Sequence, residues 1–234
     1  MKKTILSVIA LAMSMLAFAA ETAHVQIQLT GVNGQLPDVV TLTEDDAQTS
    51  AFEPGVDVEK VMSQAGSKSV LIYGIVDEHK CGTVVSDDLD GLKIGFATNQ
   101  IDQNYKLTFI NVSGKALKLF DRVTGQLIDI TENGEYPFSV EAALVGLNLV
   151  NDRFEIGEPA AELCFTYNIL DIYGYAGKSL VITDAESGAE IDNVPALGLM
   201  YSRDLGAYKG RLVVTLDGEE YQIDANPDVT SVHP

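Results

Sequence analysis

The sequence predicts an all-β protein with two β-sandwich domains of immunoglobulin-like or jelly-roll-like type. Three observations predict this fold class. Apolar and polar residues alternate along many short segments, turn dipeptides separate these segments at intervals of about 8–12 residues, and the periodicity of amphipathic helices is almost absent. A sheet buried on one face produces this alternation, because successive side chains of a strand point to opposite faces.

Residues 1–19 have the composition of a cleaved secretory signal peptide. Lys2 and Lys3 precede an apolar run over residues 5–18, and the small residues Ala17 and Ala19 end it. The run is too short for a stable membrane span, and no cysteine follows it that could carry a lipid. We therefore expect an exported protein without a transmembrane span, located at the outer-membrane surface or outside the cell. The periplasm is the alternative.

The composition is strongly acidic. The 234 residues contain 34 Asp and Glu against 15 Lys and Arg, for a formal net charge of −19. Such a surface repels phosphate backbones and anionic lipids, so we expect neither a nucleic-acid partner nor peripheral membrane binding. The chain is long enough for one large or two modest domains, each with its own core.

The strands follow from the alternation, which is clearest over residues 25–29, 105–109, 117–119 and 213–215. The turn dipeptides are Asn33-Gly34, Asp90-Gly91, Ser113-Gly114, Thr124-Gly125, Asn133-Gly134, Ser187-Gly188 and Asp217-Gly218. The clearest hairpin joins residues 211–216 to residues 219–223 through Asp217 and Gly218, because such pairs supply the positive φ angles of two-residue hairpin turns.

Two segments depart from the strand pattern. Residues 56–64 place Val58, Val61 and Met62 on one helical face, which indicates a short helix or a turn. Residues 141–150 are apolar without alternation and fit either a buried strand or a short helix.

Proline and small residues at 157–161 predict a domain boundary. We place a β-sandwich domain at residues 22–157 and a smaller immunoglobulin-like domain at 160–226. The smaller domain is short for an independent core, so we expect its stability to depend on contacts with the larger domain. Residues 227–234 show no apolar pattern and are expected to be frayed.

An ordered series of short motifs resembles a pattern in exported proteins of bacteria that carry the type IX secretion system. The series is Tyr105, Leu107 and Phe109; Leu117, Leu119 and Asp121; Thr124 and Gly125; Ile128 and Ile130; Tyr136 and Phe138; Arg153 and Phe154. With related segments near residues 42–45 and 70–73, the resemblance covers about residues 38–156. Independently of it, Arg153 either stacks on an aromatic ring, pairs with an acid near a sheet end or is solvated.

The second domain resembles the sorting module that often follows this pattern in those proteins. The strand and turn over residues 180–190 and the closing hairpin over residues 208–221 carry the likeness. The resemblance implies that the C-terminal domain sorts or anchors the protein. Together with the expected leader and the few catalytic candidates, it leads us to predict an exported, non-enzymatic protein with a structural or adhesive role. The expected partners are the secretion machinery, cell-surface components or glycans.

Two cysteines, Cys81 and Cys164, occur in a chain expected to reach an oxidising compartment. A disulfide between them would close a loop of about 80 residues and contribute about 4 kcal/mol in the chain-entropy model. The alternative is two buried thiols in separate cores.

Candidate residues for catalysis or metal binding are few. His79 lies two residues before Cys81, but it fits a polar turn before a strand better than a catalytic centre. No nucleophile elbow, zinc motif, phosphate loop or dinucleotide fingerprint occurs, so we expect neither an enzyme nor a cofactor. Asp88 and Asp90 alternate before Gly91, as in the front of a calcium loop, or they form an exposed acidic turn.

A glycan-binding module is the main alternative function, and a secreted hydrolase comes third. Tyrosines crowd the second domain at positions 167, 173, 175, 201 and 208. Grouped on the surface they could stack on sugar rings; distributed over the core they would cap it with their hydroxyls in water.

Overall fold

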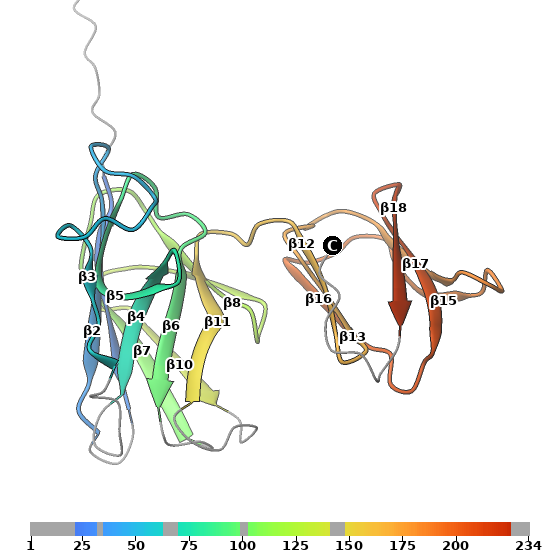
Figure 1. Ribbon diagram of the computed structural model, residues 1–234, viewed down its shortest axis with the longest axis horizontal. Helices are drawn as coiled ribbons and strands as arrows, with labels where there is room; N and C mark the ends of the chain where they lie inside the picture. Colours follow the sequence, from blue (N-terminus) through green and yellow to red (C-terminus); the bar gives the residue numbers. More distant parts are fainter. Residues whose placement is uncertain (1–21, 32–34, 63–69, 99–102, 141–147, 226–234) are drawn as a thin grey trace, which may run out of the picture.

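The computed structural model describes residues 22–31, 35–62, 70–98, 103–140 and 148–225 (Figure 1). These residues form strands and no α-helix, which confirms the prediction of an all-β protein. The strands fall into one sheet of eleven strands and two sheets of three and four strands. Within these ranges no helix has the length and apolarity needed to cross a membrane.

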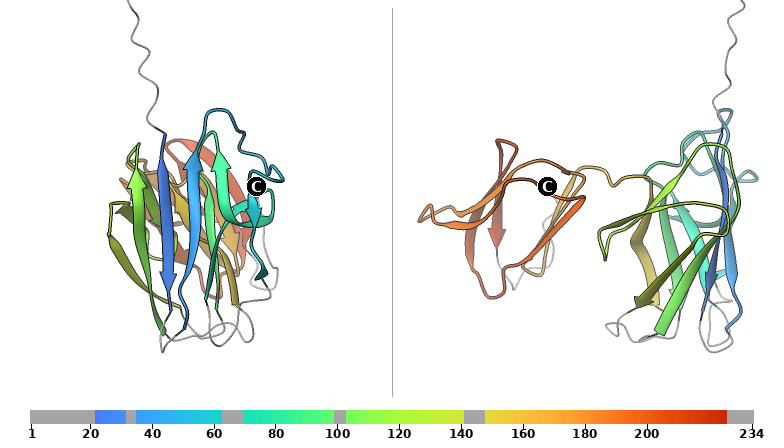
Figure 2. Two further views of the ribbon diagram at one scale, coloured as in Figure 1. Left: turned by 90° about the vertical axis from the view of Figure 1, so that its left-hand side faces the viewer. Right: turned by 180° about the vertical axis from the view of Figure 1, so that it is seen from behind.

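The large sheet contains the first eleven strands, which we call the first unit. Its strands are β1 (His24–Thr30), β2 (Asp38–Glu44), β3 (Val58–Glu59), β4 (Leu71–Val76), β5 (His79–Ser86), β6 (Lys93–Thr98), β7 (Gln103–Ser113), β8 (Lys118–Asp121), β9 (Gln126–Asp129), β10 (Glu135–Val140) and β11 (Asn148–Ile156). They pair in the order β10-β7-β1-β2-β5-β4-β6-β11-β8-β9, and β3 pairs with β5. Figure 2 (left) shows β7, β1, β2 and β5 side by side.

The large sheet curls over itself, and β5 is where the two halves join. Residues 79–81 of β5 pair antiparallel with β4, and residues 83–86 pair parallel with β2. Rings from distant strands of the sheet order then meet in the interior: Phe138 of β10 lies 5.5 Å from Phe96 of β6 and 5.1 Å from Phe154 of β11, between ring centroids. The core of the first unit is therefore enclosed between two layers of one continuous sheet.

The remaining strands form the second unit. They are β12 (Glu162–Thr166), β13 (Ile169–Tyr173), β14 (Leu180–Asp184), β15 (Glu190–Val194), β16 (Met200–Asp204), β17 (Gly210–Leu216) and β18 (Glu219–Ala225). One sheet has the order β12-β13-β16 and the other the order β15-β14-β17-β18. Buried side chains from both sheets, including Leu170, Ile182 and Val214, form one cluster separate from that of the first unit.

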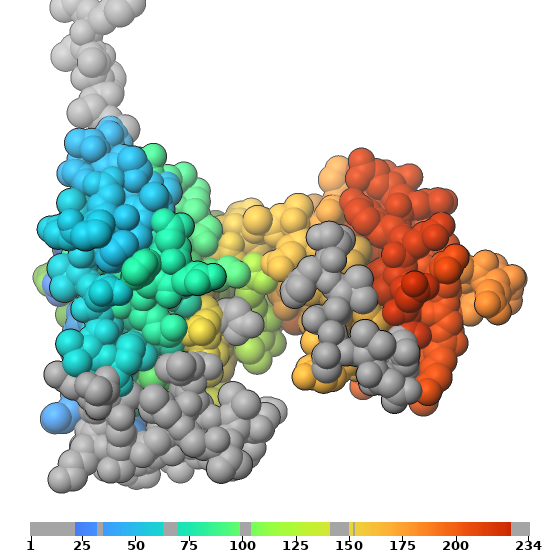
Figure 3. Space-filling model, viewed as in Figure 1, coloured from blue at the N-terminus to red at the C-terminus, as the bar shows by residue number. Residues whose placement is uncertain are grey.

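Residues 157–161 carry no strand and join the two units, which Figure 3 shows as two masses with a waist between them. Gly157 adopts a φ of 88°, and a Cβ at this position would lie 2.8 Å from Oδ1 of Asp90. Glycine is therefore required where the chain leaves β11.

The predicted hairpin over residues 211–223 is confirmed. β17 and β18 pair antiparallel from Leu216 with Glu219 to Gly210 with Ala225, and Asp217 and Gly218 have φ angles of 49° and 91°. The two residues have the positive φ angles that a two-residue hairpin turn of the primed type requires.

Of the two alternatives for residues 56–64, the turn is confirmed and no α-helix forms over the described part, where Met62 lies in a 3₁₀ turn. Residues 56–62 contain a turn and the short strand β3, and Val58 and Val61 are exposed. The buried carboxylate of Asp57 explains this, because it accepts backbone N–H groups of Glu53 and Val85 and so ties the turn to β5. The other segment without alternation covers residues 141–150, and its last three residues are the first three of β11. Residues 141–147, Asn33-Gly34, the expected leader and the expected tail lie outside the described residues.

Replacing Phe138 with alanine tests whether the curled sheet depends on this ring. Phe138 is buried and contacts rings from β6, β7 and β11, so Phe138→Ala is expected to lower the free energy of unfolding by about 3–5 kcal/mol. Urea unfolding followed by circular dichroism measures the loss. Phe52→Ala is the control, because Phe52 is half-buried and stacks on the exposed ring of His79. Equal losses for the two variants would contradict the expectation.

Candidate functional site

The motif residues at 121–154 meet in one place, at the gap between the ends of the curled sheet. Arg153 on β11 donates to both carboxylate oxygens of Asp121 on β8, from Nε at 3.1 Å and from Nη2 at 2.9 Å. The side chain of Asp121 is 0 % exposed and that of Arg153 is 6 % exposed. Arg153 also donates from Nη1 to the backbone oxygen of Ser139 on β10, at 2.6 Å. One guanidinium thus connects three strands across the gap.

The acceptor capacity of Asp121 is fully used. Besides Arg153, its Oδ1 accepts the backbone N–H of Val123 at 2.9 Å, and its Oδ2 accepts the hydroxyl of Tyr136 at 2.8 Å. A carboxylate offers about four lone-pair sites, and each is filled. Tyr136 in turn contacts the hydroxyl of Thr124 at 3.1 Å, which brings the Thr124-Gly125 turn into the same network. This saturation indicates a structural ion pair.

Arg153 also stacks, so two of its three expected environments occur together. Its Cζ lies 4.6 Å from the ring centroid of Phe138 and 5.1 Å from that of Phe154. A guanidinium over aromatic faces is attracted by the ring quadrupole. The solvated alternative is wrong, because the side chain is buried.

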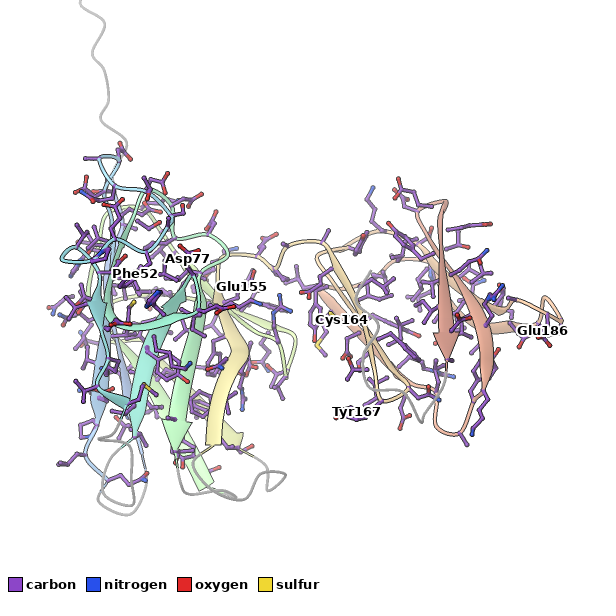
Figure 4. All side chains as sticks on the ribbon, viewed as in Figure 1. Phe52, Asp77, Glu155, Cys164, Tyr167 and Glu186 are labelled. Carbon is purple, nitrogen blue, oxygen red and sulfur yellow. The ribbon has the colours of Figure 1, made fainter. Side chains whose placement is uncertain are left out.

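Arg122, the neighbour of Asp121, connects the two units. It donates from Nε and Nη2 to Oε2 of Glu155 on β11, at 3.0 and 2.7 Å, and from Nη1 to Oε2 of Glu162 on β12, at 2.7 Å. Its Cζ lies 4.6 Å from the ring centroid of Tyr173 on β13. Figure 4 labels Glu155 in the first unit and Cys164 in the second, on either side of this contact. The second unit is therefore held against the first by charge and by stacking.

Two hollows border this region. One, of about 930 Å³, lies along β10 and has Arg153, Phe138, Gln126 and Asn104 in its wall. The other, of about 460 Å³, lies between the units and has Lys93 and Asp171 in its wall. Arg153 borders both, so the ion pair that closes the sheet also forms part of each hollow.

The structure does not bring Cys81 and Cys164 together. Both thiols are free: Cys81 is buried in the core of the first unit, and Cys164 on β12 donates to Oε1 of Glu162 at 3.0 Å. Burial, with Asp57 and Glu59 nearby, raises the pKa of Cys81 to about 11. Burial and the bond to Glu162 raise the pKa of Cys164 to about 12. Neither thiol is therefore activated as a nucleophile.

His79 is exposed on the surface, whereas Cys81, two residues further along β5, is buried. Its ring stacks on Phe52 with centroids 3.9 Å apart, and its Nδ1 lies 2.7 Å from Oε1 of Glu59. Both members of this pair are exposed. The arrangement is a surface contact at the start of β5.

Asp88 and Asp90 lie in the turn between β5 and β6. Oδ1 of Asp88 accepts the backbone N–H of Asp90 at 3.0 Å and lies 3.9 Å from Nζ of Lys115. The carboxylate is thus used within the turn. In the described part of the chain no group of three His, Cys, Asp or Glu residues is placed to hold a metal ion.

Three tyrosines of the second unit, Tyr201, Tyr208 and Tyr221, donate their hydroxyl groups to carboxylates. Tyr201 donates to Oδ2 of Asp192 at 2.7 Å, and Tyr208 donates to Asp184. Both rings are half-buried against the core, as is that of Tyr175, and Tyr173 lies under Arg122. Tyr167, at the tip of the β12–β13 hairpin, is 67 % exposed (Figure 4).

Comparison with known proteins finds no protein family, curated protein or solved structure that matches this chain.

The interactions of Asp121 and Arg122 were not predicted, although the sequence contained a signal for them. Asp121 is the last residue of β8 and Arg122 the first residue after it, at the position where the alternating pattern ends. A carboxylate that is buried at a strand end requires a partner. The sequence offers 15 Lys and Arg as partners, and nothing in it selects Arg153.

Asp121→Asn tests the ion pair. The variant leaves the buried guanidinium of Arg153 without its counter-charge, so we expect the free energy of unfolding to fall by about 3–5 kcal/mol. Glu135→Gln is the control, because it breaks the exposed pair of Lys106 and Glu135 and should cost at most about 1 kcal/mol. Urea unfolding compares the two. If Asp121→Asn lowers the free energy of unfolding no more than the control does, the ion pair does not stabilise the fold as proposed.

Acid should weaken the second unit. Hydrogen bonds from Tyr208 and Ser187 hold the pKa of Asp184 well below its usual range, and Tyr201 lowers that of Asp192. A carboxylate with a lowered pKa stabilises the fold above its unfolded pKa, about 3.9, and this contribution is lost as pH falls through the folded pKa. We therefore expect the melting temperature to decrease when the pH is lowered below about 4. We expect Tyr208→Phe to make this decrease smaller. Identical pH profiles would contradict the assignment; Tyr167→Phe, at an exposed ring, is the control.

Proposed function

We propose that the protein is an exported, non-enzymatic protein of the cell surface or envelope with a structural or adhesive role. It would consist of two β-sandwich domains, the first over residues 22–157 and the second over residues 160–226. The second would be an immunoglobulin-like module that sorts or anchors the protein. The secretion machinery and cell-surface components are the proposed partners.

One observation carries this proposal. The motif elements that resemble the type IX pattern are spread over 50 residues of sequence, yet they meet in a single cluster. Asp121, Thr124, Tyr136 and Arg153 are linked by hydrogen bonds, and Phe138 stacks with Tyr105 at 5.7 Å between centroids. Joint packing gives a physical reason for the order and spacing of these residue types, which supports reading the series as one motif.

The strand arrangement of the second unit supports an immunoglobulin-like module. Sheets of three and four antiparallel strands face each other across one core, as in sandwiches of this class. Tyr208 lies at the corner between β16 and β17, and its hydroxyl bonds Asp184. β18 carries Glu219, Glu220 and Asp224, whereas the final strand of the sorting modules it resembles is usually basic. The proposal that the second unit is an immunoglobulin-like module is therefore supported by the sandwich and not by that strand.

The chemistry of the described side chains supports a non-enzymatic role. Cys81 and Cys164 have raised pKa values, and the acids of the central cluster are fully engaged with arginines. His79 has a surface carboxylate as its partner and no described nucleophile beside it.

Deleting residues 160–234 tests the sorting role. The truncated protein is expected to be exported but to lose its place at the cell surface, because the proposed anchoring module is gone. Surface protease accessibility and fractionation of cells measure this. The full chain with Tyr167→Ala is the control, since an exposed side chain is changed and the module stays. Circular dichroism of the truncated protein checks that the first unit still folds. Normal surface delivery of a folded truncated protein would refute the sorting role.

A further inference from the structure

The hollow along β10 has the dimensions of a ligand site. Its volume is about 930 Å³, within the range of about 300–1,000 Å³ that is usual for small-molecule sites. The edge strand β10 forms one wall, the β8–β9 hairpin a second, and β11 the floor. It lies where the two ends of the curled sheet approach each other.

The residues that the structure describes in the wall of this hollow carry almost no net charge. In a chain of net charge −19, Arg153 is its one charged residue within the described part, and Asp121 neutralises that charge at 2.9 Å. An anion meets the negative field of the whole protein, and a cation finds no carboxylate among the described residues of the wall. The charge distribution therefore selects an uncharged ligand.

The polar groups of the wall are hydrogen-bonding groups with spare capacity. Asn104, Gln126 and Ser139 are exposed, and no side-chain hydrogen bond of theirs occurs in the described structure. A guanidinium has five N–H donors, and Arg153 uses three of them, two on Asp121 and one on Ser139. Amide and guanidinium groups of this kind bind hydroxyl groups.

Apolar groups lie between these polar ones. Val123 is 64 % exposed at the hairpin, and Val140 and Val150 extend the apolar surface toward Phe138. A ligand with hydroxyl edges and C–H faces matches such an alternation of polar and apolar groups.

An extended peptide fits this edge less well. In the register with β7, Pro137 lies in the middle of β10 and has no N–H to offer an added strand. The backbone oxygen of Ser139 is already occupied by Arg153. Strand addition would therefore lose both a donor and an acceptor at its centre.

We propose that the hollow along β10 binds an uncharged carbohydrate unit, with Asn104, Gln126 and Arg153 contacting its hydroxyl groups. This inference rests on the proposed function, because it supplies the ligand class of the adhesive role. It places the sugar on the first unit and not on the tyrosines of the second.

A glycan array probed with the purified full-length protein tests the proposal. We expect binding to neutral glycans and not to sialylated or sulfated ones. The double variant Asn104→Leu/Gln126→Leu should weaken the affinity for the bound glycan at least tenfold, measured by isothermal titration calorimetry. Both side chains are exposed, so the melting temperature should be unchanged. The matched control is Tyr167→Ala, which should bind as well as the parent protein.

Four outcomes would overturn the proposal. They are a blank array, binding to charged glycans alone, loss of binding in Tyr167→Ala with the double variant unaffected, and displacement of the glycan by an extended peptide that pairs with β10. The measurement uses purified protein and is independent of sorting. If the protein is sorted but binds no glycan, only the proposed carbohydrate site is contradicted. If the protein binds glycan but its second unit does not sort it, only the sorting role is contradicted.

Discussion

The buried pair of Asp121 and Arg153 closes the curled sheet through side chains, because the two end strands of the sheet do not pair through their backbones. The sheet order runs from β10 at one end to β9 at the other, and these ends do not pair with each other through their backbones. Pro137 in β10 has no N–H for a further strand, so the end strand is protected from pairing with other chains. Arg153 instead bonds Ser139 on β10 and Asp121 on β8, which closes the curled sheet by side chains.

The alternation of apolar and polar residues predicted the strands, because a strand that is buried on one face must alternate in this way. β1 is buried at Val25, Ile27 and Leu29, the residues whose alternation indicated it. The turn at Asp217 and Gly218 was visible because glycine marks positive φ. Two other turns were hidden: Asp77-Glu78 and Tyr167-Asn168 also have positive φ angles, with no glycine to mark them. Asn and Asp tolerate this conformation, so these positions carried a weaker signal.

Long-range pairing was not readable from the chain. Arg153 meets an acid 32 residues away, and β5 divides its length between β2 and β4, so no local window contains either fact. The cysteines show the same limit. Their spacing is equally compatible with a bridge and with separate cores, and the fold places Cys81 inside one unit and Cys164 on the other.

Adjacent residues at the end of β8 serve two purposes because strand geometry sends them to opposite sides. Asp121 points into the first unit and binds Arg153, whereas Arg122 points outward and binds Glu162 of the second unit. The buried pair of the first unit and the ion pair between the units are therefore formed by neighbouring residues of one hairpin. The hollow along β10 has the same origin, since the hairpin that carries Val123 and Gln126 is fixed by Asp121 through the N–H of Val123. The dipeptide Asp121-Arg122 thus contributes to the closure of the sheet, to the docking of the second unit and to the shape of the proposed carbohydrate site.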